Sequence, residues 1–113
     1  MRRSDKIILG KIITAIDVGL KVFKDAELEF FLESDSLKLS MAMTIIRIGE
    51  LVKNLSPEIR NENSHIAWKD IAGFRDVAAH KYDTLIMSDV YATAKNDFPQ
   101  LKMQIEKILE VDD

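Results

Sequence analysis

The sequence predicts an all-α protein, an up-and-down bundle of four main helices with one or two short helices. Apolar residues recur at steps of three and four along most of the chain, and no stretch alternates as a half-buried strand would. Of the 113 residues, 47% are hydrophobic, and only 4 are Gly and 2 are Pro, which favours a compact helical protein over a disordered chain. Residues 1–113 are expected to form one domain with one modest core.

The first main helix is expected to begin at Ser4, a favoured N-cap residue, with Asp5 in its first turn. Gly10 and Gly19 lie inside it, and we interpret both as places where a neighbouring helix approaches closely. The apolar stripe that defines this helix consists of Leu9, Ile12, Ile16, Leu20 and Phe23.

The acidic segment 24–35 is expected to be a short helix or turn whose aromatic residues, Phe30 and Phe31, cover one end of the bundle. The second main helix is expected to be capped by Asp35 or Ser36. Its seam, spaced by threes and fours, is formed by Leu37, Met41, Ile45, Ile48, Val52 and Leu55.

This second helix is apolar on more than one side, because Met43 and Ile46 widen its face beyond a single stripe. Such a helix has two packing partners, either in its own chain or in a second subunit. Arg47 and Glu50 are three residues apart on it, and we interpret them as an ion pair of little net worth at a surface or interface.

A short helix follows, since Ser56 is a good cap and Pro57 suits the first helical position. It ends in a polar loop, just beyond which His65 is expected to be a bystander. The third main helix is expected from Ala67 or Trp68, with the tryptophan as a packing anchor. Its predicted core face consists of Ile71, Phe74, Val77 and Ala78.

The last main helix is expected to be capped by Ser88. Pro99 lies inside its apolar pattern, so the helix is expected to be kinked there or to restart after Asp97. Residues 110–113 are expected to fray.

The totals exclude several classes of function. With a net charge of −3, the chain is not basic overall as nucleic-acid binders usually are. Any RNA contact must therefore come from a local basic patch or a dimer cleft. No cysteine is present, and two histidines fifteen residues apart give no ligand spacing, so neither a metal nor a cofactor site is expected. The apolar runs are too short to span a bilayer, and no signal-peptide pattern opens the chain, which points to the cytoplasm.

Four residues with chemical potential, Arg75, Asp76, His80 and Tyr82, fall within two turns of the third helix and its exit. Asp76 and His80 are four apart and share a face, whereas Arg75 and His80 point about 140° apart on an ideal helix. Only a long side chain such as arginine could share a pocket with that histidine. We therefore expect a pocket at the end of the helix, or one completed by a second copy of it.

An arginine with a histidine suits phosphate-ester chemistry. A guanidinium binds phosphate oxygens in a fork, and a histidine side chain can move a proton near neutral pH. Asp76, one turn before His80, could orient the imidazole and favour its protonated form. On spacing alone the preferred interpretation is simpler, namely a helix end whose histidine is favoured by the helix dipole.

The segment Trp68–Ile71, followed by Arg-x4-His-x-Tyr over Arg75–Tyr82, resembles the signature of the HEPN superfamily. More narrowly, it resembles the HepT-like toxins of HepT–MntA toxin–antitoxin pairs. Ile48–Glu50 and Pro99–Leu101 resemble two further stretches typical of that group. The resemblance extends over essentially the whole chain.

This resemblance implies a HEPN-like homodimer in which two motifs face each other across an interface cleft. It implies the toxin of a type VII-like toxin–antitoxin pair, a metal-independent endoribonuclease with Arg75 and His80 as catalytic residues and Asp76 in support. It also implies an MntA-like nucleotidyltransferase antitoxin that transfers AMP to Tyr82. Family members often carry asparagine after the arginine and an acidic residue where this chain has Lys81.

Two alternatives remain at this stage. The chain could be a non-catalytic partner of a nucleotidyltransferase, binding nucleotide or acting as an adaptor. It could also be a purely structural helical dimer.

Overall fold

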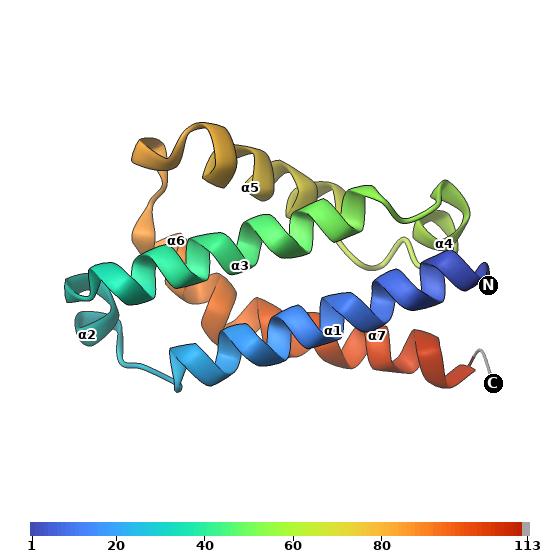
Figure 1. Cartoon of the computed structure of the whole chain (residues 1–113), viewed down its shortest axis with the longest axis horizontal. Coiled ribbons are helices and arrows are strands. Elements are labelled where there is room, and N and C mark those ends of the chain that lie inside the picture. Colours follow the sequence, from blue (N-terminus) through green and yellow to red (C-terminus); the bar gives the residue numbers. More distant parts are fainter. Residues whose placement is uncertain (112–113) are drawn as a thin grey trace.

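A computed structural model describes residues 1–111 as a bundle of four long antiparallel helices, which confirms the predicted all-α fold (Figure 1). These are α1 (Arg3–Phe23), α3 (Asp35–Lys53), α5 (Trp68–His80) and α7 (Phe98–Val111). α3 lies between α1 and α5, and α7 packs against α1. No β-strand occurs in this described range. The chain direction alternates from one long helix to the next, as expected of an up-and-down bundle.

Short helices connect the long ones. α2 (Leu28–Glu33) and α6 (Met87–Ala92) lie at one end of the bundle, and α4 (Pro57–Glu62) lies at the other, near the N-terminus. A 3₁₀ turn, η1 (Tyr82–Thr84), follows α5, and a π-helical segment, η2 (Thr93–Asp97), joins α6 to α7. The predicted last helix is therefore the run of α6, η2 and α7.

The core is built from the predicted seams. In α1 and α3 these residues are buried, apart from the half-buried Leu20 and Leu37, and Leu55 is buried just after α3. Burial of such apolar side chains is the main stabilising term for a bundle of this size. The largest fully buried side chains are Phe23, Phe31, Leu9, Ile12, Ile16, Met41, Ile48, Ile105, Val52 and Val90.

Aromatic side chains close the end of the bundle beside α2. The rings of Phe23, Phe31 and Tyr91 meet with centroids 5.5–6.0 Å apart, and the Tyr91 hydroxyl donates a hydrogen bond to the Ala26 carbonyl at 2.7 Å. The predicted cover is thus confirmed for Phe31. It is wrong for Phe30, which is 64% exposed, because a six-residue helix turns only one side to the core.

Several helix starts differ from the predicted ones. Ser34, not Asp35 or Ser36, caps α3, its hydroxyl accepting from the Leu37 amide at 3.2 Å. The predicted Ser4 cap is wrong because α1 already begins at Arg3, with no side-chain cap.

The predicted start at Ser56 is confirmed, with its hydroxyl accepting from the Ile59 amide. Asp5 lies in the first turn of α1 as expected, but it is buried and also serves α4. Its two carboxylate oxygens accept from the Ser56 amide at 2.9 Å and from the Ser56 hydroxyl at 2.6 Å. One carboxylate therefore joins the starts of two helices.

The last helix restarts after Asp97, as predicted, because α7 begins at Phe98. Pro99 has no amide hydrogen to donate, and the wider π-helical turn precedes it. Ser88 is not a cap, since α6 begins one residue earlier, at Met87, after Ile86. α7 continues regularly to Val111, so fraying is not seen there, and residues 112 and 113 lie outside the described range.

The two glycines of α1 differ. A Cβ at Gly19 would lie 2.7 Å from the side chain of Thr44, so α1 and α3 approach closely there, as predicted. The same prediction is wrong for Gly10, where a Cβ would meet nothing within 4 Å. Within residues 1–111, no helix is both long and apolar enough to span a membrane.

Candidate active site

The predicted motif lies where α5 approaches α3 closely. A Cβ added at Gly49 would lie 2.1 Å from the Cβ of Arg75 and 2.5 Å from its Cγ. No side chain other than hydrogen fits at position 49 without moving α5. Gly49 therefore allows the stem of Arg75 to lie directly on the backbone of α3.

Two carboxylates and one imidazole surround the guanidinium of Arg75. Nη2 donates to Glu50 on α3, and Nη1 donates to Asp76 at 3.0 Å. Nη1 also lies 3.5 Å from Nε2 of His80. The hydrogen bond to Glu50, followed by that to Asp76, raises the pKa of Arg75, so the group stays cationic at any physiological pH.

The arginine side chain thus reaches His80 within one chain. Helix geometry allows this contact only for a long side chain, because the two residues point in different directions from α5. His80 is exposed at the last position of α5, where the helix ends. The predicted pocket at the end of the helix is therefore an open, charged surface in the single chain.

Asp76 does not orient His80, contrary to the prediction. Its Oδ1 accepts from Nζ of Lys53 on α3 and from Nη1 of Arg75, and the described structure contains no hydrogen bond between Asp76 and His80. The hydrogen bond from Lys53, followed by that from Arg75, lowers the pKa of the Asp76 carboxyl. The bond from Lys53 therefore ties this carboxylate to α3.

Tyr82 follows the helix exit as the first residue of η1, two positions beyond His80. Its side chain is half-buried, and its hydroxyl has no hydrogen-bond partner in the part of the chain that is described. By contrast, the hydroxyl of Tyr91, the only other tyrosine in the sequence, is engaged at the bundle end.

Sequence reasoning missed two site residues, Glu50 and Lys53. It assigned Glu50 to an ion pair with Arg47, but the structure pairs Glu50 with Arg75, 25 residues away, and Arg47 has no ion pair among residues 1–111. The available signal was the three-residue spacing of Glu50 and Lys53, which places opposite charges on one side of the helix that carries Gly49.

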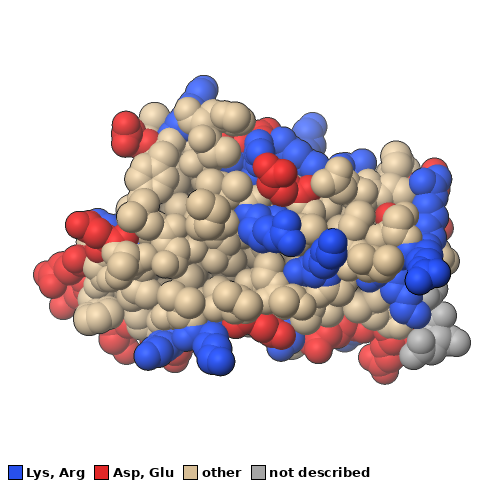
Figure 2. Space-filling model, viewed as in Figure 1, with Lys and Arg blue, Asp and Glu red and all other residues tan. Residues whose placement is uncertain are grey.

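The outward side of α3 leads from apolar side chains to this cluster. Leu39, Met43, Ile46 and Glu50 are spaced by four, three and four, and the first two are 57% and 63% exposed. Figure 2 shows a broad uncharged surface toward the α2 end, with basic and acidic side chains meeting where α3 and α5 run together. α3 packs against both α1 and α5, so its two predicted packing partners lie in its own chain, and Ile46 is half-buried against the core. Leu39 and Met43 remain exposed.

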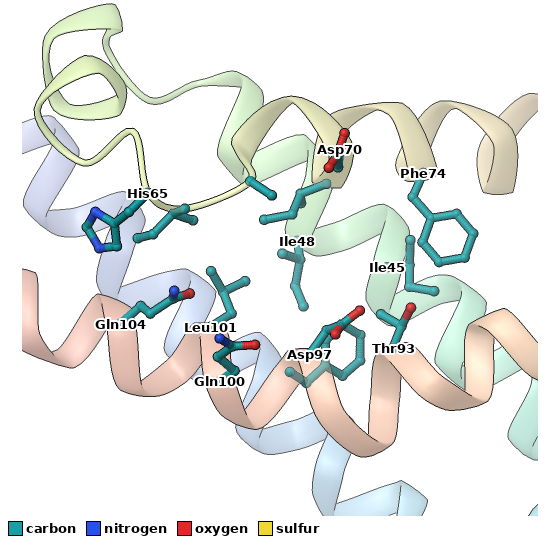
Figure 3. Close-up of a pocket in the computed structure, with 14 residues that line it drawn as sticks. Ile45, Ile48, His65, Asp70, Phe74, Thr93, Asp97, Gln100, Leu101 and Gln104 are labelled. Carbon is teal, nitrogen blue, oxygen red and sulfur yellow. The ribbon is translucent and has the colours of Figure 1, made fainter.

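A groove of about 310 Å³ lies on the other flank of α5, between α5 and α7 with α3 as its floor (Figure 3). Its apolar walls include Ile48, Phe74 and Leu101, and Asp70 and Asp97 stand at its polar rim. The predicted core residues Ile71 and Phe74 line this groove and are only half-buried, and Val77 is also half-buried, while Ala78 and Trp68 are buried.

None of the four motif residues lines this groove in the described structure. The exposed His65 lies at the edge of this groove, in the loop before α5 and outside the Arg75–Tyr82 motif. Across residues 1–111, no three histidine or acidic side chains gather in a way that could hold a metal ion.

A family model and several known proteins match this chain, and their descriptions name the same kind of protein. The family model described as "Ribonuclease HepT-like" matches residues 12–108. The chain is 32% identical to "Putative RNase MJ0125" of Methanocaldococcus jannaschii over 96% of this chain and 94% of that protein. It is 29% identical to "Probable ribonuclease HepT" of Thermococcus cleftensis over 96% of this chain and 98% of that protein.

A longer relative matches along only part of its length. The chain is 36% identical to "Gamma-glutamylcyclotransferase and putative RNase MJ0434" of Methanocaldococcus jannaschii over 97% of this chain, and it spans half of that protein. No solved structure matches the chain.

Proposed function

The chain belongs to the Ribonuclease HepT-like family, and we propose that it is an endoribonuclease whose catalytic residues are Arg75 and His80. The observation that carries this proposal is the 3.5 Å approach of Arg75 Nη1 to His80 Nε2 on an exposed surface. A scissile phosphate beside these two groups would meet a permanent cation and a proton carrier at once.

The proposed reaction is an internal transesterification. The ribose 2′-oxygen attacks the adjacent phosphorus, the bond from phosphorus to the 5′-oxygen breaks, and the products carry a 2′,3′-cyclic phosphate and a 5′-hydroxyl. Arg75 stabilises the negative charge that builds on the phosphorane oxygens. His80 takes the 2′-hydroxyl proton, and a proton must reach the leaving 5′-oxygen, so no step requires a metal.

A homodimer fits this chemistry because one imidazole cannot take one proton and give another in the same instant. Two copies of His80 across a cleft would supply both roles. The exposed apolar stripe of Leu39 and Met43, which leads to Glu50 on the same side of α3, supports a dimer interface beside the motif. In that arrangement RNA binds at the junction of two chains that are each acidic overall.

The test uses the two histidines of the chain as a matched pair. Purified protein is incubated with mixed RNA and EDTA, beside His80→Ala and His65→Ala forms. We expect the wild type and His65→Ala to leave 2′,3′-cyclic phosphate ends and His80→Ala to be slower by about 10²–10⁴-fold. Equal cleavage by the His80→Ala protein would disprove the assignment, and loss of cleavage in EDTA would disprove metal independence.

We place the enzyme as the toxin of a type VII-like toxin–antitoxin pair, with Tyr82 as the target of an MntA-like nucleotidyltransferase. The Tyr82 oxygen would attack the α-phosphorus of ATP, forming the tyrosyl–AMP bond and releasing pyrophosphate, while the phenolic proton passes to solvent. A free hydroxyl two residues from His80 supports this role. The added bulk and negative charge would exclude RNA.

The two tyrosines allow a clean test of this modification. Coexpression with such a nucleotidyltransferase is expected to add one AMP to the wild type and to Tyr91→Phe, and none to Tyr82→Phe. Mass spectrometry of the intact protein measures the change. AMP on the Tyr82→Phe protein would contradict the proposal.

A non-catalytic adaptor is the second candidate, because two carboxylates already occupy the guanidinium of Arg75. It predicts a stable complex with the nucleotidyltransferase, or nucleotide binding, without cleavage of any RNA. The same EDTA assay separates it from the nuclease.

A further inference from the structure

Four charged side chains form an alternating chain across the contact of α3 and α5. Glu50 accepts from Arg75, Arg75 also donates to Asp76, and Asp76 accepts from Lys53. Glu50 and Lys53 lie one turn apart on α3, and Arg75 and Asp76 are neighbours on α5. Each α3 residue thus holds one of the two adjacent α5 residues.

The aliphatic part of the Arg75 side chain is packed in place, in addition to the ion pairs of its guanidinium. Its side chain is 16% exposed, its first carbons lie against Gly49, and its Nε is buried with no hydrogen-bond partner in the described structure. An arginine free in solution loses side-chain entropy when it is fixed. Here the structure fixes it before any ligand arrives.

We propose that Glu50 and Lys53 are positioning residues of the active site. Glu50 orients the guanidinium so that Nη1 faces His80. Lys53 binds the Asp76 carboxylate and neutralises its charge next to the proposed phosphate-binding position. The proposal rests on the proposed nuclease function of Arg75 and His80.

Donor geometry favours positioning over blockage of Arg75. Glu50 takes one of the two Nη2 hydrogens, so the other remains for a phosphate oxygen. Nη1 points to Asp76 and His80, where the reacting groups must meet.

Charge accounts for Lys53. Two carboxylates and two cations give the cluster a net charge of zero, and removing the lysine leaves it at −1. A local negative charge repels RNA phosphates, and the effect is strongest where water is partly excluded.

The first experiment concerns Glu50. Glu50→Gln keeps the shape and one acceptor oxygen but loses the charge, and kcat is expected to fall by about 10–100-fold while KM for RNA changes little. Glu29→Gln, on the exposed side of α2, is the control and leaves both constants unchanged. A lower KM with unchanged kcat would show that Glu50 competes with phosphate, and this would overturn the proposal.

A second measurement is independent of cleavage. Because Nε of Arg75 is buried, its N–H is expected to exchange slowly with solvent in NMR spectra of the wild type and much faster in Glu50→Gln. Equal exchange in the two proteins overturns the positioning role. Failure of the wild type to cleave RNA overturns the proposed function instead, so the two failures are distinguishable.

The second experiment concerns Lys53. Lys53→Met is expected to raise KM for RNA by about tenfold or more, and adding Asp76→Asn to that variant restores KM because no charge is then left unpaired. Lys21→Met on α1 is the control for loss of one positive charge from the protein. If the double variant binds RNA no better than Lys53→Met alone, the neutralising role is wrong.

Discussion

The carboxylate of Asp76 lies between two cations, and hydrogen bonds from Lys53 and then Arg75 lower its pKa. A depressed carboxyl pKa stabilises the native state above the unfolded value of about 3.9, and this stabilisation is lost as pH falls through the folded value. Asp76 is 50% exposed, so its contribution is screened by solvent and small.

We therefore expect Asp76→Asn to lower the unfolding midpoint by a constant amount above about pH 5, and by less as the pH falls below about 4. Thermal unfolding of both proteins across this range measures the difference. Asp35→Asn, at a 95% exposed carboxylate, is the comparison. A difference that grows toward acid would contradict the assignment of Asp76 as a charged, ion-paired group in the native state.

Helix geometry predicted the site contacts within one helix only in part. The long side chain of Arg75 brings its Nη1 to 3.5 Å from Nε2 of His80, as predicted, whereas the predicted pairings of Asp76 with His80 and of Arg47 with Glu50 are wrong. The partners of Arg75 and Asp76 on α3 could not be found in this way, because they depend on the register between two helices. That register is fixed by the contact at Gly49, a long-range event with no local sequence pattern.

At the level of elements, Gly49 and Gly73 form a natural pair for experiment. Gly49→Ala pushes a methyl group into Arg75, and it is expected to cost about 1–3 kcal/mol of stability and to displace the guanidinium. At Gly73, inside α5, a Cβ meets nothing within 4 Å, so Gly73→Ala is expected to stabilise by up to about 1 kcal/mol. Chemical denaturation of both variants measures the two values. Similar changes in both would contradict the close approach at Gly49.

The buried link between α1 and α4 gives a second prediction at this scale. Asp5→Ala leaves the Ser56 amide without its acceptor, and it is expected to destabilise the protein by about 1–3 kcal/mol. Asp17, also on α1, forms an ion pair with Lys102 of α7 near the surface. Asp17→Ala removes this pair and is expected to lower the stability by less than about 0.5 kcal/mol. Equal losses would mean that the Asp5 link is worth no more than a surface pair.

Helix existence was predictable, whereas helix starts were predicted only in part. The threes-and-fours spacing decides which residues are buried, so the seams of α1 and α3 appear in the sequence. Serine is common at caps, but Ser4 and Ser88 have no capping role, while Ser34 caps one residue earlier than expected. Asp5 illustrates why local patterns do not fix the helix starts. It lies in the first turn of α1, yet its carboxylate also accepts from the Ser56 amide, 51 residues away at the start of α4.

The molecule as a whole is expected to be a homodimer through the outward side of α3. Met43→Asp would place two carboxylates in that apolar contact and is expected to raise the dimer Kd by about tenfold or more. Met103→Asp, at a side chain 57% exposed on α7, is the control. Sedimentation of each protein over a range of concentrations measures the dissociation. A monomeric wild type, or equal effects of both substitutions, would contradict this interface.

The packing of α1 against α7 imposes an order in time on the growing chain. α7 begins at Phe98, 75 residues after α1 ends at Phe23, which at about 5–20 residues per second corresponds to roughly 4–15 seconds of synthesis. During that interval the side of α1 that will face α7 has no partner in its own chain. α3 and α5 are separated only by α4 and its loops, so they can pair sooner. A nascent chain can thus bring Arg75 beside His80 before its core closes, and until then it remains open to chaperones and proteases.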